Sequence, residues 1–137
     1  MAQLEGKVAI ITGAGTGIGK GICRSFAREG ARLVLASRNR ANLEATADEV
    51  RSQGGTALVV PTDVTAEDQV RTLFEKTLEE FRRLDILVNN SGAFDGGPLE
   101  DITLETWQKV VGVNLTGPFL CTREAMRIMK AQGGGRI

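Results

Sequence analysis

The sequence predicts a Rossmann-like α/β fold, in which a doubly wound parallel sheet lies between two layers of helices (three-layer α/β/α). Strand and helix patterns alternate along the 137 residues, and the strand patterns are continuously apolar rather than alternating apolar with polar. Continuously apolar strands are typical of parallel sheets covered on both faces, and the intervening helices form right-handed crossovers. The length suits one domain, which we place at 1–137.

Short runs of β-branched and aliphatic residues give the expected strands. They lie at 8–11, 33–36, 57–60 and 85–88, and 136–137 has the pattern of the start of a fifth strand. Between the strands, apolar residues recur at helical spacing. The first helix begins at Ile18 and is closed by Gly30, and the second ends at Gly54. Pro61 is expected to stop the third strand, and the Thr65 side chain to cap the third helix.

The stretch 7–19 joins the first strand to the first helix through glycines at 13, 15, 17 and 19. A strand that turns through glycines into a helix gathers free backbone N–H groups at the positive end of that helix, and this geometry binds phosphate. The spacing does not fit the phosphate loop of nucleoside triphosphatases, because Gly19 and Lys20 are followed by Gly21. It does not fit G-x-G-x-x-G either, because Ile18 takes the place of the last glycine. A purely structural turn is the alternative.

Composition argues against several other functions. Seventeen basic and seventeen acidic residues cancel, so nothing points to nucleic acid or an anionic membrane as a partner. No apolar run approaches the ~20 residues of a membrane span, and the N-terminus lacks the form of a signal peptide, so we expect a cytoplasmic protein. The chain has no histidine, and Cys23 and Cys121 are far apart. We therefore expect buried, reduced thiols and no metal site.

Turn-forming or hydrogen-bonding residues follow each expected strand. They are the glycines of 13–19, then 37–40, 63–64 and 89–92. Because the carboxyl ends of parallel strands meet at one edge of the sheet, and ligands of such folds bind there, we expect these residues to lie close together. Each also has an ordinary interpretation as loop chemistry, and an aspartate such as Asp63 commonly caps a turn.

Four motifs together resemble those of the short-chain dehydrogenase/reductase (SDR) family, of its classical type. They are Thr12-Gly-x-x-x-Gly-x-Gly19, Asp63-Val64, Asn89-Asn90-Ser91-Gly92 and Val113-Asn114-Leu115. The resemblance covers essentially the whole chain. Ser91 stands where the family usually has alanine, which is a change from one small residue to another.

The resemblance implies a binding site for a nicotinamide dinucleotide. The glycine turn would hold the pyrophosphate, Asp63 and Val64 would border the adenine, and Asn90 would lie beside the ribose on the nicotinamide side. The implied cofactor-binding residues are Gly13, Gly15, Thr16, Gly17, Ile18, Gly19, Ser37, Arg38, Asp63, Val64, Asn90, Ser91 and Gly92.

The end of the second strand favours NADP(H) over NAD(H). NAD-preferring sites usually place an acid there, whose carboxylate binds the ribose 2′-hydroxyl and repels a 2′-phosphate. No acid occurs at 32–42, where Ser37, Arg38 and Arg40 offer donors that suit the phosphate. Solvated surface arginines are the alternative. Some NADP-preferring relatives have a basic residue where this chain has Thr16, so NAD(H) stays an alternative cofactor.

A long helical pattern covers about 103–131, and Asn114 lies within its apolar face. Asn114 is the one member of the family's Asn-Ser-Tyr-Lys catalytic tetrad that the resemblance places in this chain. Because Pro118 has no N–H to bond the Asn114 carbonyl, we expect a kink at 112–118 and an ordered water on that carbonyl. The alternative is an Asn114 side chain that simply bonds nearby backbone. The broad apolar face of this helix predicts a homo-oligomer.

The resemblance implies an oxidoreductase that moves hydride between the nicotinamide and a small-molecule carbonyl or secondary alcohol, like a 3-oxoacyl reductase or a small sugar or alcohol dehydrogenase. The family's catalytic Ser and Tyr-x-x-x-Lys are not found in 1–137, which contains no tyrosine. We interpret the chain as the amino-terminal portion of a longer enzyme, cut after the start of its fifth strand, and expect no carbonyl reduction by this portion alone. A non-catalytic dinucleotide-binding or assembly module is the alternative.

Overall fold

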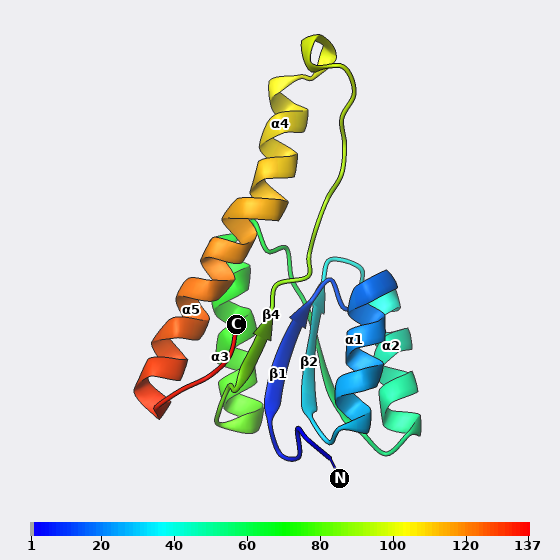
Figure 1. The fold of residues 1–137 in the computed structure, drawn as a ribbon, viewed down its shortest axis with the longest axis vertical. Helices are drawn as coiled ribbons and strands as arrows, with labels where there is room; N and C mark the ends of the chain where they lie inside the picture. Colours follow the sequence, from blue (N-terminus) through cyan, green and yellow to red (C-terminus); the bar gives the residue numbers. More distant parts are fainter. Residues whose placement is uncertain (1) are drawn as a thin grey trace.

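The strands form one parallel sheet, in which the order of the strands reverses at β1 (Figure 1). A computed structural model describes residues 2–137. Its strands are β1 (Val8–Thr12), β2 (Arg32–Ser37), β3 (Thr56–Pro61) and β4 (Ile86–Val88). Their order in the sheet is β3-β2-β1-β4, and every pair is parallel. The chain builds outward from β1 to β3 and then returns to the other side of β1, which confirms the predicted doubly wound fold.

The register of the strands brings their carboxyl ends level. Ile11 pairs with Leu35 on β2 and with Val88 on β4. The loops that follow the strands therefore leave from one edge, which we call the carboxyl rim. At the opposite edge, the amino edge, Arg136 forms a parallel bridge with Ile86. This bridge agrees with the expected start of a further strand.

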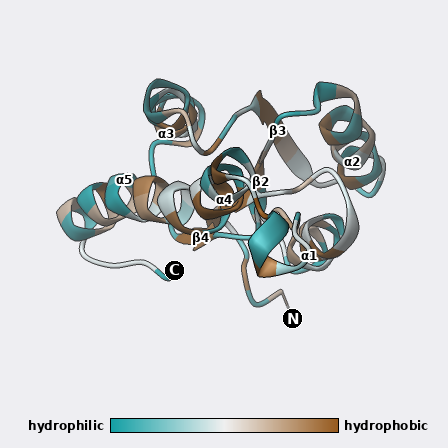
Figure 2. Ribbon diagram, turned by 90° about the horizontal axis from the view of Figure 1, so that it is seen from above, coloured by the Kyte–Doolittle hydropathy of each residue, from teal (hydrophilic) through white to brown (hydrophobic). Residues whose placement is uncertain are grey.

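Two helices cover each face of the sheet. α1 (Gly17–Arg28) and α2 (Arg40–Ser52) lie on one face, and α3 (Glu67–Phe81) and α5 (Gly117–Gln132) lie on the other, as the view from above shows (Figure 2). Successive side chains of a strand point to opposite faces, so β1 serves both layers. Ile10 belongs to the core under α3 and α5, Ile11 to the core under α1 and α2, and both are fully buried. Burial on both faces explains the continuous apolar pattern of β1.

One local prediction is confirmed and one is wrong. β3 stops at Pro61, which is its last residue and is paired with Ser37. Proline is tolerated there because β3 lies at the edge of the sheet, where one row of N–H groups has no partner strand. Thr65 does not cap α3, whose N-cap is Ala66. The Thr65 hydroxyl instead donates to Asp63 Oδ1 at 2.7 Å, because an ionised carboxylate is the stronger acceptor.

A π-helical turn divides the long helical pattern. α4 (Leu104–Val111) is followed by Gly112–Thr116 in π conformation and then by α5. Pro118 supplies no N–H for the Asn114 carbonyl, and a wider turn accommodates the missing bond. The α-helical ladder is therefore interrupted where expected, while α4 and α5 continue end to end as one long element (Figure 1). No helix within residues 2–137 is both long and apolar enough to cross a bilayer.

The segment between β4 and α5 projects beyond the carboxyl rim (Figure 1). A loop at 89–98 rises from β4, a 3₁₀ turn at Leu99–Asp101 follows, and α4 leads back to the body of the molecule. None of the eight residues of α4 is buried. This projecting segment therefore stands beside the place where the strand-end loops meet.

Candidate functional site

Loops from all four strands, together with the π turn, meet in a small cleft at the carboxyl rim. This rim cleft has a volume of about 100 Å³ and is lined by Gly13, Ser37, Arg38, Thr62, Asp63, Val64, Ser91, Gly92 and Val113. All of these except Thr62 and Val113 are residues that the sequence predicts for cofactor binding. The cleft adjoins the switch point between β1 and β4, where ligands of doubly wound sheets bind.

We call the turn at 13–19 the glycine turn. At two of its positions, Gly13 and Gly19, only glycine fits the observed backbone. Gly13 has a φ of +63°, and a Cβ on it would lie 2.8 Å from Asn90 Nδ2. A Cβ on Gly19 would collide with the carbonyl oxygen of Gly13. The first turn of α1 can therefore approach the end of β1 closely only because these side chains are missing.

The start of α1 offers hydrogen-bond donors at the carboxyl rim. Thr16 is the N-cap, and within residues 2–137 its side chain makes no capping hydrogen bond. Gly17, with a φ of +52°, would have open space around an added Cβ, and the Ile18 side chain is 77% exposed. The first N–H groups of this 12-residue helix are thus left for an external acceptor at the positive end of the helix. A phosphate group fits that position.

Thr12 and Asn90 fasten the glycine turn to the loop after β4. The buried Thr12 hydroxyl oxygen accepts hydrogen bonds from the backbone N–H groups of Asn90 and Ser91, both at 2.9 Å. Asn90 Nδ2 donates to the carbonyl oxygens of Thr12 at 3.1 Å and Gly13 at 3.2 Å. The Asn90 amide is thus a brace of the turn, and its expected place beside a ribose stays a prediction. Sequence reasoning placed Thr12 in the glycine motif but missed this bonding role, although a hydroxyl at the end of a buried strand next to a glycine turn is a usable signal.

Asp63 is held as a charged carboxylate. Its Oδ1 accepts hydrogen bonds from the Thr65 backbone N–H at 2.9 Å and from the Thr65 hydroxyl at 2.7 Å. The hydroxyl hydrogen bond is the main reason that the pKa of Asp63 lies below its usual range; burial opposes this effect, and the nearby charge of Arg38 adds to it. Asp63 therefore shapes its own loop and also places a negative charge at the rim cleft.

Ser37 and Arg38 reach the rim cleft from the end of β2. Arg40 Nη1 pairs with Glu44 at 3.2 Å, whereas Arg38 has no salt bridge to any residue of 2–137. Ser37 Oγ lies 3.4 Å from the position that a Cβ of Gly15 would take, so this hydroxyl adjoins the glycine turn. A guanidinium that forms no salt bridge in the described chain, beside a hydroxyl and a helix N-terminus, is suited to bind a phosphate.

Asn114 lies in the π turn and holds the loop that follows β4. Its Nδ2 donates to the carbonyl oxygens of Ala93 at 2.7 Å and Val110 at 2.9 Å, and its Oδ1 accepts from the Ala93 N–H at 3.4 Å. The alternative interpretation of Asn114, a side chain bonded to nearby backbone, therefore describes its amide correctly. Its main-chain carbonyl lies at the break that Pro118 makes in the ladder. The ordered water on that carbonyl stays a prediction.

The two cysteines are buried and free, as expected. Burial raises the pKa of the Cys23 thiol to about 12 and that of Cys121 to about 11. Both thiols are therefore protonated at neutral pH and unsuited to act as nucleophiles. The described residues 2–137 contain no group of three or more His, Cys, Asp or Glu side chains that could hold a metal ion.

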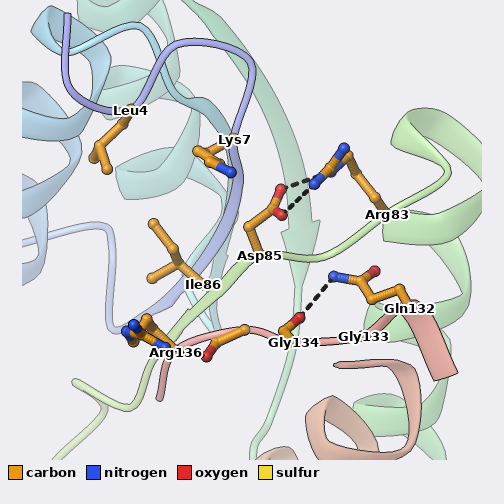
Figure 3. Close-up of a pocket in the computed structure, with 10 residues that line it drawn as sticks. Leu4, Lys7, Arg83, Asp85, Ile86, Gln132, Gly133, Gly134 and Arg136 are labelled. Carbon is orange, nitrogen blue, oxygen red and sulfur yellow. Dashed lines mark hydrogen bonds and ion pairs between the residues drawn. The ribbon is translucent and has the colours of Figure 1, made fainter. Parts of the chain in front are cut away.

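A larger cleft, of about 450 Å³, lies at the amino edge and includes Lys7, Arg83, Asp85 and Arg136 (Figure 3). The Asp85 carboxylate accepts hydrogen bonds from Arg83 Nε at 2.8 Å, from Arg83 Nη2 at 2.6 Å and from the Val8 N–H at 2.9 Å. The hydrogen bond from Val8 ties β1 to the start of β4, and the two from Arg83 hold the carboxylate in place. The amino-edge cleft includes none of the predicted site residues, so the rim cleft is the candidate site.

Comparison with known proteins gives the family. Residues 7–137 match the family model described as short chain dehydrogenase. A 3-oxoacyl-[acyl-carrier-protein] reductase of Synechocystis is 38% identical over 138 residues, which cover 100% of this chain and 56% of that protein. A short chain dehydrogenase/reductase of Aspergillus oryzae is 41% identical over 135 residues, which cover 97% of this chain and 52% of that protein. The chain thus spans about half the length of the curated relatives it matches.

Solved structures agree with the sequence comparison. A short-chain type dehydrogenase/reductase from Mycobacterium marinum is 40% identical with a TM-score of 0.93, and the match covers 97% of this chain and 55% of that one. A metagenomic short-chain oxidoreductase solved in complex with NADP is 36% identical with a TM-score of 0.92, and the match covers 96% of this chain and 60% of that one. The chain therefore belongs to the short-chain dehydrogenase/reductase family.

Proposed function

We propose that the rim cleft and the glycine turn bind NADP(H), and that the whole enzyme moves hydride between the nicotinamide and a carbonyl or secondary alcohol. The family consists of oxidoreductases. One relative is named a 3-oxoacyl-[acyl-carrier-protein] reductase, and one similar structure holds NADP. These names support the reaction class. Because this chain spans about half the length of its relatives, the catalysis is proposed for the whole enzyme.

The preference for NADP(H) rests on one observation, the surroundings of Arg38. Its guanidinium lines the rim cleft beside the Ser37 hydroxyl and forms no salt bridge within residues 2–137. A ribose 2′-phosphate would give it a dianionic partner with matching hydrogen-bond geometry. The acidic side chain that would repel such a phosphate is missing from the end of β2. The nearest carboxylate in the cleft, Asp63, is already bonded to Thr65.

The residues present fit the rest of such a cofactor. The uncapped start of α1 suits a pyrophosphate, and Asp63 and Val64 form a wall of the cleft for an adenine. The bound cofactor supplies hydride to a carbonyl carbon, or accepts it from an alcohol carbon. Thr12 and Asn90 keep the glycine turn in place, and Asn114 keeps the loop after β4 in place. We assign the main-chain carbonyl of Asn114 to the proton relay, through a bound water.

We also propose that the intact enzyme is a homo-oligomer assembled through the long helix at 103–131, which the structure divides into α4, the π turn and α5. Large apolar side chains are exposed along α4, the π turn and α5, at Leu104, Trp107, Leu115, Phe119 and Met126. Large exposed apolar side chains that recur along one element are a common feature of protein interfaces. Light scattering on the complete enzyme tests this, since a monomer at micromolar concentration contradicts it.

The decisive test of cofactor preference compares Arg38→Asp with Arg40→Asp. NADPH and NADH are titrated into the wild type and both variants, and binding is followed by the fluorescence of the reduced nicotinamide. The wild type should bind NADPH more tightly. Arg38→Asp should weaken NADPH binding about 10- to 100-fold, because a charge-assisted hydrogen bond is worth about 1.5–3 kcal/mol, and should leave NADH binding nearly unchanged.

Arg40→Asp is the matched control, because Arg40 already pairs with Glu44 on the solvent side of α2. It should change the NADPH-to-NADH ratio less than threefold. Equal affinities for the two cofactors in the wild type, or equal effects of the two variants, would contradict the proposal. Tight NADPH binding by a complete protein that reduces no carbonyl would favour the non-catalytic dinucleotide-binding module.

A further inference from the structure

Thr46 is a fully buried polar residue in the middle of α2, next to the glycine turn. Its hydroxyl oxygen lies 3.2 Å from the carbonyl oxygens of both Ala14 and Asn42. The contact with Asn42, four residues earlier, is the ordinary one for a threonine within a helix. The contact with Ala14 is different, because it joins α2 to the turn that follows β1.

The backbone of Ala14 is held on both sides. Its N–H donates to the Ala36 carbonyl oxygen of β2 at 3.3 Å, and its own carbonyl oxygen accepts from the Thr46 hydroxyl. Ala14 is fully buried, and within residues 2–137 no other donor bonds this carbonyl oxygen. A buried carbonyl without a donor is costly, so the Thr46 hydroxyl fixes this part of the glycine turn against α2.

This contact lies between the two proposed phosphate positions. The glycine turn leads to one of them, the uncapped start of α1, and the other is formed by Ser37 and Arg38 directly before α2. The turn and α2 are in close contact, since a Cβ added to Gly15 would lie 2.8 Å from the Asn42 Cβ and 3.4 Å from Ser37 Oγ. A shift of the turn relative to α2 would therefore change the spacing of the two phosphate positions.

We infer that Thr46 is a positioning residue for the cofactor, whose hydroxyl sets the spacing between these two phosphate positions. The inference rests on the proposed function, because it requires one ligand that occupies both positions. Thr46 is fully buried, so it acts through the glycine turn and not by touching the ligand. A ligand that carries both phosphates depends on their spacing, whereas a ligand that carries only one does not.

The test measures ligand binding to the complete enzyme that contains residues 1–137, by isothermal titration calorimetry. The ligand 2′,5′-ADP carries both phosphates on one adenosine, and 2′-AMP carries only the 2′-phosphate. Thr46→Val replaces the hydroxyl with a methyl group of similar size. It should weaken the binding of 2′,5′-ADP about 3- to 10-fold, as expected for one hydrogen bond, and change the binding of 2′-AMP less than about twofold.

Two further variants at this position separate the hydroxyl from the shape of the side chain. Thr46→Ala also lacks the hydroxyl, so it should weaken the binding of 2′,5′-ADP and spare that of 2′-AMP in the same way. Thr46→Ser keeps the hydroxyl and should bind both ligands about as tightly as the wild type. Circular dichroism at the temperature of the titrations verifies that each variant is folded.

Thr77→Val is the matched control, because Thr77 is also fully buried and its hydroxyl donates only within α3, to the Leu73 carbonyl oxygen, on the other face of the sheet. It should leave the binding of both ligands unchanged. An unchanged affinity for 2′,5′-ADP in Thr46→Val, an equal loss for 2′-AMP, or the same loss in Thr46→Ser or Thr77→Val would overturn the inference while the proposed function stands. No binding of 2′,5′-ADP to the wild type would overturn both.

Discussion

At the scale of single residues, the glycine turn depends more on the close approach of neighbouring groups to its glycines than on backbone flexibility. Gly19 must lack a Cβ because the Gly13 carbonyl oxygen occupies that space, and Gly13 must lack one because of Asn90. Gly21, further inside α1, is exposed, and a Cβ added to it would have nothing within 4 Å. Of these two glycines, only two residues apart, Gly19 has no room for a side chain and Gly21 has ample room.

This contrast gives a matched pair of variants. Gly19→Ala should lower the free energy of unfolding by at least about 2 kcal/mol, because the added carbon forces the backbone of the turn apart. Gly21→Ala should raise it by about 0.5–1 kcal/mol, because alanine is the better helix former and has room. Urea denaturation followed by circular dichroism measures both. Destabilisation of equal size in the two variants would show that the close contact at Gly19 is wrong.

Residue roles were only partly predictable from the sequence. The positions at the rim followed from the strand ends, and most of the predicted cofactor residues line one cleft. The hydrogen-bond partners of these side chains could not be predicted from the sequence, because they come from other strands of the sheet. Thr12 and Asn90 are 78 residues apart in the chain and bond each other. Thr65 has the residue type of an N-cap, but the carboxylate of Asp63 binds its hydroxyl instead.

At the scale of elements, the missing N–H of proline predicted the interruption in the long helix, whereas helix propensities could not have predicted it. Proline lacks an N–H, so the break at the Asn114 carbonyl followed from Pro118 alone. The π form of the break could not be predicted in this way. The Asn114 amide bonds Ala93, which lies in the loop after β4, and the sequence pattern does not give the path of that loop.

The attachment of β4 to β1 at the amino edge predicts a pH dependence. Burial alone would raise the pKa of Asp85, but hydrogen bonds from Arg83 and from the Val8 N–H hold it below its usual range. A carboxyl whose pKa is lowered by folding stabilises the folded chain above its unfolded value of about 3.9, and this stabilisation is lost as the pH falls toward the folded value. The free energy of unfolding should therefore fall between about pH 5 and pH 3.

Asp85→Asn isolates this contribution. The variant should lose about 1.5–3 kcal/mol at pH 7, as expected for hydrogen bonds to a charged group, and the difference from wild type should shrink toward pH 3. Asp48→Asn is the control, because the Asp48 side chain is exposed and, among residues 2–137, pairs only with Arg51 on the same helix. A difference between wild type and Asp85→Asn that is constant from pH 7 to pH 3 would rule out this explanation of the amino edge.

At the scale of the whole molecule, the fold was predictable because each strand is buried on both faces and leaves a continuous apolar pattern. Strict alternation with helices then required parallel strands and right-handed crossovers. The order β3-β2-β1-β4 does not follow from that pattern, since a helix of the same length can lead to either side of β1. The helix of the projecting segment was predicted, but not that it stands away from the body of the molecule with none of the side chains of α4 buried.

The proposed function requires that the carboxyl rim, and not the amino edge, binds a dinucleotide phosphate. Amide chemical shifts of the ¹⁵N-labelled chain, recorded during titration with NADP⁺, locate the contact residue by residue. We expect the largest shifts at 13–19, at Ser37 and Arg38, and at Asp63 and Val64, with little change around Asp85 and at 133–136. Shifts centred on the amino-edge cleft, or none at the glycine turn at millimolar NADP⁺, would contradict the assignment of the rim.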